Sequence, residues 1–175
     1  MNKLEINNIK KILWDWIIVI FIAITVGILI KKFIIFQVEI PSESMIHTLN
    51  VEDRLYATRI YNPEKLKRGD LIVFYFEPED EMFIKRLIGF PNDEIVIKDG
   101  VVSVNGEILT EDYVENPDDF KGEYKVPDNK YFFLGDNRKN SLDSRYWENP
   151  YIDFKDIKGK AFFRIYPFNN IGIVE

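Results

Sequence analysis

The chain has 175 residues, of which 46% are hydrophobic and 15% are aromatic. This length supports a domain with its own hydrophobic core, and this composition excludes an intrinsically disordered chain. Cysteine is absent and histidine occurs once, which excludes disulfides, a cysteine nucleophile and a cluster of histidine ligands. We therefore expect neither a metal site nor a cofactor.

Charge is distributed unevenly along the chain. Residues 1–36 contain five lysines and two acidic residues, a net charge of +3. The remaining residues carry 18 basic and 27 acidic side chains, a net charge of −9. An acidic body without a basic patch argues against nucleic acid as a partner.

The most apolar run is "WIIVIFIAITVGILI" (16–30). Its 15 uncharged residues, at about 1.5 Å each, are too short for a hydrocarbon core of roughly 30 Å. The apolar pattern continues, however, into Leu13 and Trp14 and, beyond two lysines that can snorkel, into "FIIF" (33–36). A cleavable signal peptide would need a small-x-small site after the run, and a buried soluble helix would need an equally apolar partner; the sequence contains neither. It therefore predicts an N-terminal segment (1–12), a membrane anchor (13–36) and a second domain (37–175).

Several later segments have the patterns of β-strands. Residues 70–76 ("DLIVFYF") form a continuous apolar run, typical of a strand buried on both faces. Residues 94–109 contain alternating strands that meet at Asp99-Gly100, a pair suited to a type I′ hairpin turn, with a second turn at Asn105-Gly106. Further strands are predicted at 82–90, 130–134 and 161–166.

Two segments are predicted to lie outside the strands. Residues 111–129, rich in Asp, Glu, Asn and Pro, indicate a long surface loop. Residues 153–159 ("DFKDIKG") indicate a short helix that ends at glycine. The expected fold is therefore mainly β: a single transmembrane helix followed by one antiparallel domain, barrel-like or sandwich-like.

The segment "IPSESMIHTL" (40–49) brings together Ser42, Ser44 and the single histidine, His47. Serines after a proline are ordinarily turn residues, so this short pattern alone is weak evidence for a nucleophile. Members of a catalytic triad rarely adjoin one another along an extended chain, and no carboxylate is assigned to orient the His47 ring. We expect His47 to be a surface or turn residue and not a base.

Lys85 breaks the apolar pattern of a predicted strand. If residues 82–88 are extended, Phe83, Lys85 and Leu87 share one face. A lysine in that position loses water, which lowers its pKa, and a neutral amine can act as a general base for a serine hydroxyl. The alternative is an exposed lysine that protects a sheet edge. The adjacent Arg86 weakens this alternative, because one of the two side chains must point inward.

The polar segment "GDNRKNSLDSR" (135–145) directly follows the apolar "YFFL". As a loop it would be ordinary. At the end of a strand it can also form a hydrogen-bond network that orients a catalytic group.

In this order, "PSESM" after an anchor, "YFEPEDEMFIKRLIGFPND" and "GDNRKNSLDSR" closely resemble the motifs of type I signal peptidases. These are membrane-bound serine proteases that remove signal peptides from exported proteins. The resemblance extends to "YPF" (166–168), and the length is similar to that of the small, single-anchor form of Gram-positive bacteria. It implies an all-β protease core of antiparallel sheets.

The resemblance also implies a role for each matching residue. Ser44 would be the nucleophile and Lys85 the general base. Ser42 would form an oxyanion hole with the Ser44 backbone N–H, and Ser141 would orient the Lys85 amine through a hydrogen bond. Loss of Ser44 or Lys85 would abolish activity, whereas loss of Ser42 would impair it. Two supporting ion pairs are implied: Asp143 with Arg145, and Asp136 with Arg86.

Enzymes of this family select small residues, usually alanine, at the first and third positions before the cut. The resemblance implies shallow apolar pockets, although the same residues could simply form the core. An extended substrate would pair with the edge strands at 38–42 and 81–84. The implied pocket residues are Val38, Ile40, Met45, Leu49, Leu55, Val73, Phe83 and Ile84.

The implied partners are the signal peptides of exported pre-proteins and the lipid bilayer. The N-terminus would lie in the cytoplasm and the catalytic domain outside, and we expect a monomer. Three positions depart from the family pattern: His47 replaces a proline, Glu43 separates the two serines, and Asn92 replaces a glycine. None removes a catalytic group, so the departures bear on substrate preference.

Two alternatives stay open: a specialised relative that serves a narrow set of clients such as pilins, and a membrane-tethered binding module without activity. Self-cleaving repressors share a similar Ser-Lys core but are soluble and cut at Ala-Gly or Cys-Gly. The chain contains neither dipeptide, and it carries an apolar anchor.

Overall fold

The computed structural model describes residues 3–175, so residues 1 and 2 of the predicted N-terminal segment lie outside the described residues. The chain divides into two compact units, one that ends at Phe36 and one that comprises Gln37–Glu175.

The first unit consists mainly of helix α1 (Lys3–Phe33). Within it, Leu13–Phe33 is long and apolar enough to cross a membrane, with a mean hydropathy of 2.5 and exposed side chains. The helix ends before the predicted limit of the anchor at residue 36, because Ile35 already begins strand β1 (Ile35–Glu39).

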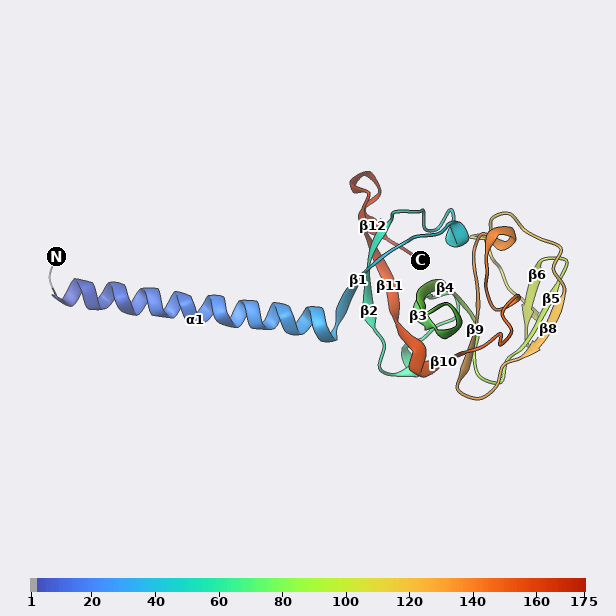
Figure 1. The fold of residues 1–175 in the computed structure, drawn as a ribbon, viewed down its shortest axis with the longest axis horizontal. Helices are drawn as coiled ribbons and strands as arrows, with labels where there is room; N and C mark the ends of the chain where they lie inside the picture. Colours follow the sequence, from blue (N-terminus) through green and yellow to red (C-terminus); the bar gives the residue numbers. More distant parts are fainter. Residues whose placement is uncertain (1–2) are drawn as a thin grey trace. The chain divides into compact units, whose positions relative to one another are not determined.

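The second unit is built on a sheet with the strand order β1-β2-β11-β3-β4-β9-β10, in which β12 also pairs with β11 (Figure 1). The pairings from β2 to β10 are antiparallel. The strands other than β1 are β2 (Arg54–Arg59), β3 (Leu71–Phe76), β4 (Glu81–Gly89), β9 (Lys130–Leu134), β10 (Ile152–Asp153), β11 (Ile157–Tyr166) and β12 (Gly172–Ile173).

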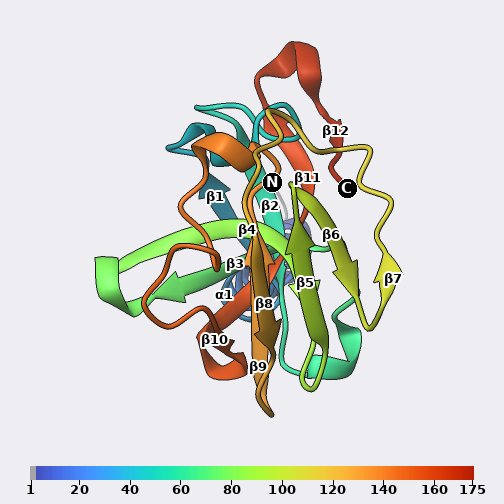
Figure 2. The same ribbon diagram turned by 90° about the vertical axis from the view of Figure 1, so that its right-hand side faces the viewer.

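A smaller antiparallel sheet has the order β7-β6-β5-β8. In Figure 1, β5, β6 and β8 lie on the opposite side of β9 from β3 and β4, and Figure 2 looks onto them. Its members are β5 (Glu94–Lys98), β6 (Val101–Val104), β7 (Glu107–Ile108) and β8 (Gly122–Lys125).

Strand β9 lies between two hydrophobic cores. Tyr131 and Phe133 pack into one core, with Phe74 of β3 and Leu87 of β4. Phe132 and Leu134, which alternate with them, pack into the other core with the apolar residues of β5 and β6. Because successive side chains of a strand point to opposite faces, a continuous apolar run such as "YFFL" fits a strand covered on both sides. The mainly β fold with one N-terminal apolar helix is confirmed.

The predicted strands and turns are present. Asp99 and Gly100 have φ values of 51° and 79°, as a type I′ turn requires, and Asn105 and Gly106 have φ values of 52° and 85° at the next turn. Asn92, which replaces a family glycine, has a φ of 70°. Asparagine tolerates this left-handed conformation better than most residues, so the turn is preserved.

Two predictions about irregular segments are wrong in part. Residues 111–129 are not wholly a loop, because they contain β8, where Tyr124 pairs with Ile95 and packs 4.7 Å from the Phe132 ring. The helix expected at 153–159 is a single 3-10 turn, Phe154–Asp156. It stops there because Ile157 begins β11, where it pairs with Phe74 of β3.

Candidate active site

Ser44 lies in a 3-10 turn, Glu43–Met45, that follows the edge strand β1. Its side chain is buried, and the turn is held from the polar segment at 135–145. The backbone N–H of Asn137 donates to Ser44 O at 3.1 Å, and the Asn137 side-chain amide donates to Glu43 O at 3.0 Å. The serine is therefore positioned by contacts from a distant part of the chain.

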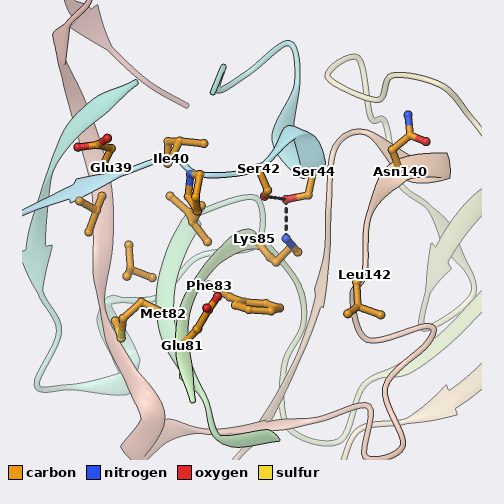
Figure 3. Close-up of a pocket in the computed structure, with 14 residues that line it drawn as sticks. Glu39, Ile40, Ser42, Ser44, Glu81, Met82, Phe83, Lys85, Asn140 and Leu142 are labelled. Atoms are coloured by element: carbon orange, nitrogen blue, oxygen red, sulfur yellow. Dashed lines mark hydrogen bonds between the residues drawn. The ribbon is translucent and has the colours of Figure 1, made fainter. Parts of the chain in front are cut away.

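Lys85 lies within β4, between the neighbouring strands β3 and β9, and is only 4% exposed. Its Nζ donates a hydrogen bond to Ser44 Oγ at 2.6 Å, and Ser42 Oγ lies 3.2 Å from Ser44 Oγ (Figure 3). Lys85 and Leu87 share the face of β4 that packs on the first core, as the strand pattern predicts.

Burial lowers the pKa of the Lys85 amine to about 8. The negative charges of Asp143 and Asp136 act in the opposite direction but do not cancel the effect of burial. Roughly one amine in ten is therefore neutral at pH 7 and can accept a proton from the serine hydroxyl beside it. The arrangement can activate Ser44 without a histidine.

A buried ion pair lies beside the lysine on the same strand. Arg86 donates from Nε and Nη2 to the two carboxylate oxygens of Asp136, at 2.8 and 2.6 Å. Thr48 Oγ1 donates to the same carboxylate at 2.6 Å, and the Arg86 guanidinium lies 3.8 Å from the centre of the Tyr113 ring. The pair is nearly inaccessible to solvent, at 4% and 0% side-chain exposure.

A second buried pair joins Asp143 to Arg145. Arg145 donates from Nε and Nη2 to the Asp143 carboxylate, at 2.8 Å in each case. The backbone N–H of Gly135 also donates to Asp143, at 2.9 Å, and Arg145 Nη2 donates to Arg138 O at 2.6 Å. The two ends of segment 135–145 are thereby tied together, which holds Asn137 where it contacts the serine turn.

Ser141 is buried, but its Oγ has no hydrogen-bond partner among the described residues. The hydrogen bond expected from Ser141 to Lys85 is therefore not formed in this structure. The Ser141 side chain instead lies over Gly135, where a Cβ would collide with it and would lie 2.6 Å from Ser44 O. The close approach of these three residues requires glycine at position 135.

His47 does not belong to the site. Its side chain is 70% exposed, and its Nδ1 lies 3.2 Å from a Glu115 carboxylate oxygen. This agrees with the predicted surface position. Among residues 3–175, no cluster of three or more His, Asp or Glu side chains is arranged to hold a metal ion.

A cavity of about 280 Å³ opens beside the Ser44–Lys85 pair. Five of the predicted pocket residues line it: Val38, Ile40, Val73, Phe83 and Ile84.

Three of the predicted pocket residues do not line this cavity. Met45, Leu49 and Leu55 are fully buried, because their side chains point into the domain interior. Two lining residues, Asn140 and Leu142, were not predicted. Leu142 was detectable as the single apolar residue of the polar segment 135–145. The other lining residues outside the predicted pocket set lie within the edge segments 38–42 and 81–84, which were predicted to pair with a substrate: Glu39, Pro41, Glu81 and Met82.

Comparison with known families matches residues 13–166 to "Signal peptidase, peptidase S26". Signal peptidase I of Leptolyngbya laminosa is 38% identical over an alignment 172 residues long, and the match covers 91% of this chain and 83% of that protein. Signal peptidase I of Bacillus licheniformis is 35% identical and matches 98% of both chains. A crystal structure of a signal peptidase I from Enterococcus faecalis is 30% identical and covers 55% of this chain and 96% of that one, with a TM-score of 0.48.

These relatives and the β domain define the class of protein as a serine peptidase. The family follows from a match that spans most of the chain: the protein belongs to the signal peptidase family, peptidase S26. Signal-peptide cleavage by a membrane peptidase is the activity of this family, and the N-terminal apolar helix fits a membrane protein.

Proposed function

We propose that this chain is a membrane-anchored endopeptidase that removes signal peptides from exported pre-proteins after a small-x-small site, with Ser44 as nucleophile and Lys85 as general base. The observation that carries the proposal is the 2.6 Å contact between Lys85 Nζ and Ser44 Oγ. A buried amine with a pKa of about 8 has the proton affinity that this role needs.

The reaction begins when the neutral Lys85 amine accepts the Ser44 hydroxyl proton and Oγ attacks the scissile carbonyl carbon. The backbone N–H of Ser44 and the hydroxyl of Ser42 donate to the oxyanion that develops. The Lys85 ammonium then gives its proton to the departing amine, which leaves an acyl-enzyme. Water, deprotonated by the same amine, hydrolyses the ester and restores Ser44.

The supporting roles follow from the same geometry. Ser141 would act as a positioning residue for the Lys85 amine, since its buried hydroxyl has no hydrogen-bond partner among the described residues that would compete for it. The two buried ion pairs, Arg86–Asp136 and Asp143–Arg145, keep β4 and the polar segment in place.

The cavity supports the proposed preference for small residues. An extended substrate would lie between residues 38–42 of the β1 edge and residues 81–84 of β4 and add main-chain hydrogen bonds to them. The cavity wall formed by Ile40, Val73 and Ile84 is closely packed, with exposures of 2%, 2% and 9%. A shallow apolar wall of this kind favours a small apolar side chain such as that of alanine.

Cleavage of a pre-protein with an Ala-x-Ala site tests the proposal. The full chain in detergent should cut it, Lys85→Ala should not, and His47→Ala should cut it at the wild-type rate, because His47 lies outside the site. Equal cutting by the wild type and Lys85→Ala would refute the mechanism. No cutting by any of the three would favour a tethered binding module.

The proposed orientation places the N-terminus in the cytoplasm and residues 37–175 outside the membrane, where signal-peptide cleavage sites emerge. The protein would act as a monomer and would not bind nucleic acid, in keeping with the acidic charge of this domain. Protease added to intact cells should degrade residues 37–175. Degradation only after lysis would reverse the orientation.

A further inference from the structure

A second cavity, of about 560 Å³, lies next to the catalytic groove. The two cavities share one wall residue, Leu142, whose side chain is half exposed. In Figure 3, Leu142 and the Phe83 ring lie opposite each other below the Ser44–Lys85 pair. The two cavities therefore adjoin at Leu142.

An aromatic wall connects the two cavities. Phe83, which lines the groove, packs with its ring centre 4.9 Å from that of Phe76. Phe76 in turn lies 4.5 Å from Trp147, and both line the second cavity. The indole N–H of Trp147 is buried and has no acceptor among the described residues, which leaves one donor at this wall unpaired.

The alternation of β4 decides which substrate side chain points toward this wall. Phe83 and Ile84 lie on opposite faces of β4, and Ile84 pairs with Val73 on the closely packed side. An extended substrate alternates in the same way, so its two small residues face the Ile84 side and the residue between them faces Phe83. This inference rests on the proposed function.

The lining of the second cavity is negatively charged. Two of its lining residues, Glu79 and Glu148, are carboxylates, and no basic side chain from the described residues lines it. Neither carboxylate forms an ion pair with any residue in the described range. A long basic side chain can lay its alkyl stem along the aromatic rings and place its charge at the carboxylates. We propose that this cavity is the subsite for the middle residue of the small-x-small site and that it selects lysine or arginine there.

Three peptides test this subsite, with Ala-Lys-Ala, Ala-norleucine-Ala or Ala-Glu-Ala before the cut. Norleucine has an apolar chain like the lysine stem but no charge. The lysine side chain would gain an exposed ion pair and an aromatic contact that norleucine cannot form. We therefore expect kcat/KM to be about three- to tenfold higher for the lysine peptide than for the norleucine peptide, and lowest for the glutamate peptide. The double variant Glu79→Gln/Glu148→Gln should bring the lysine-to-norleucine ratio close to one.

Glu107→Gln is the matched control, because Glu107 is an exposed carboxylate on β7 of the smaller sheet, outside both cavities. It should keep the wild-type ratio. Cleavage of norleucine as fast as lysine, or an unchanged ratio in the double variant, overturns the subsite while the proposed function stands. If the wild-type protein cuts none of the peptides, the proposed function fails and the subsite fails with it.

Discussion

The pH dependence of cleavage tests the proposed base directly. We expect kcat/KM to rise with pH and to level off above about 8, because only the neutral Lys85 amine can accept the Ser44 proton. Burial sets this value, since it disfavours the charged ammonium and lowers the pKa from 10.5 to about 8.

The size of the effect follows from the two pKa values. At pH 7 an amine with a pKa of about 8 is neutral in roughly one molecule in ten, whereas one with a pKa of 10.5 is neutral in roughly one in 3,000. Burial of Lys85 therefore raises the concentration of competent base by about 300-fold, or about 3 kcal/mol. Because the side chain is only 4% exposed, solvent screening reduces this effect little.

The assay is the initial rate of cleavage of a capped peptide without ionisable side chains, from pH 6 to 10.5 at constant ionic strength. At low substrate concentration it reports the pKa of the free enzyme. Lys98→Ala, which removes an exposed lysine of β5, should leave the profile unchanged. A rise that continues beyond pH 10, or a rise that disappears in His47→Ala, would refute the assignment of Lys85.

Four further changes have expected outcomes. Ser42→Ala should lower kcat by about 10²–10³-fold with little change in KM, since it removes one oxyanion donor; an unchanged kcat would exclude that role. Asp136→Ala leaves the buried Arg86 unpaired and should lower the free energy of unfolding, measured in urea, by about 3–5 kcal/mol. A loss below about 1 kcal/mol would show that the Arg86–Asp136 pair does not stabilise the fold. Lys85→Met should be more stable than the wild type below about pH 8, and this advantage should shrink between pH 8 and 10.5. In that range the unfolded wild-type chain binds more protons than the folded one, so the wild type gains stability as the pH rises. A stability difference that does not vary with pH would mean that folding does not change the pKa of Lys85. Gly135→Ala should lose at least about 10²-fold in kcat because its Cβ would lie 2.6 Å from the serine carbonyl oxygen, while Gly172→Ala, which has open space, should stay fully active.

The burial of Lys85 could be predicted because a strand has a simple period. Phe83, Lys85 and Leu87 share a face, and Arg86 must then lie on the other. The strand period cannot predict which face of β4 is buried, and in the structure both faces are covered. Arg86 is buried as deeply as Lys85 but keeps a bidentate carboxylate partner, Asp136, from outside the strand.

The pocket residues were predicted less well because a motif indicates neighbours along the chain and not the direction of a side chain. Met45 follows the serine directly, yet the 3-10 turn directs its side chain into the interior, where it is fully buried. Leu49 and Leu55 are likewise fully buried. Leu142 sits in a polar segment and reaches the groove only because that segment folds back beside β4.

Strand β8 was missed because its signal is too short to detect. Four residues, Gly122–Lys125, form the strand, and only one of its side chains, Tyr124, contacts the core cluster. Pairing with β5 stabilises the segment, and that pairing joins residues far apart in sequence.

The polar segment at 135–145 has a contact that the resemblance did not imply. The resemblance assigns the segment to the lysine, through Ser141, and the structure adds hydrogen bonds to the serine turn: Asn137 donates to the carbonyl oxygens of both Glu43 and Ser44. The Lys85 amine is already oriented by the strand that carries it and by its hydrogen bond to Ser44. A strand interior is rigid, whereas a single 3-10 turn at a sheet edge has few bonds of its own. The nucleophile therefore needs external support more than the base does, and this segment supplies it.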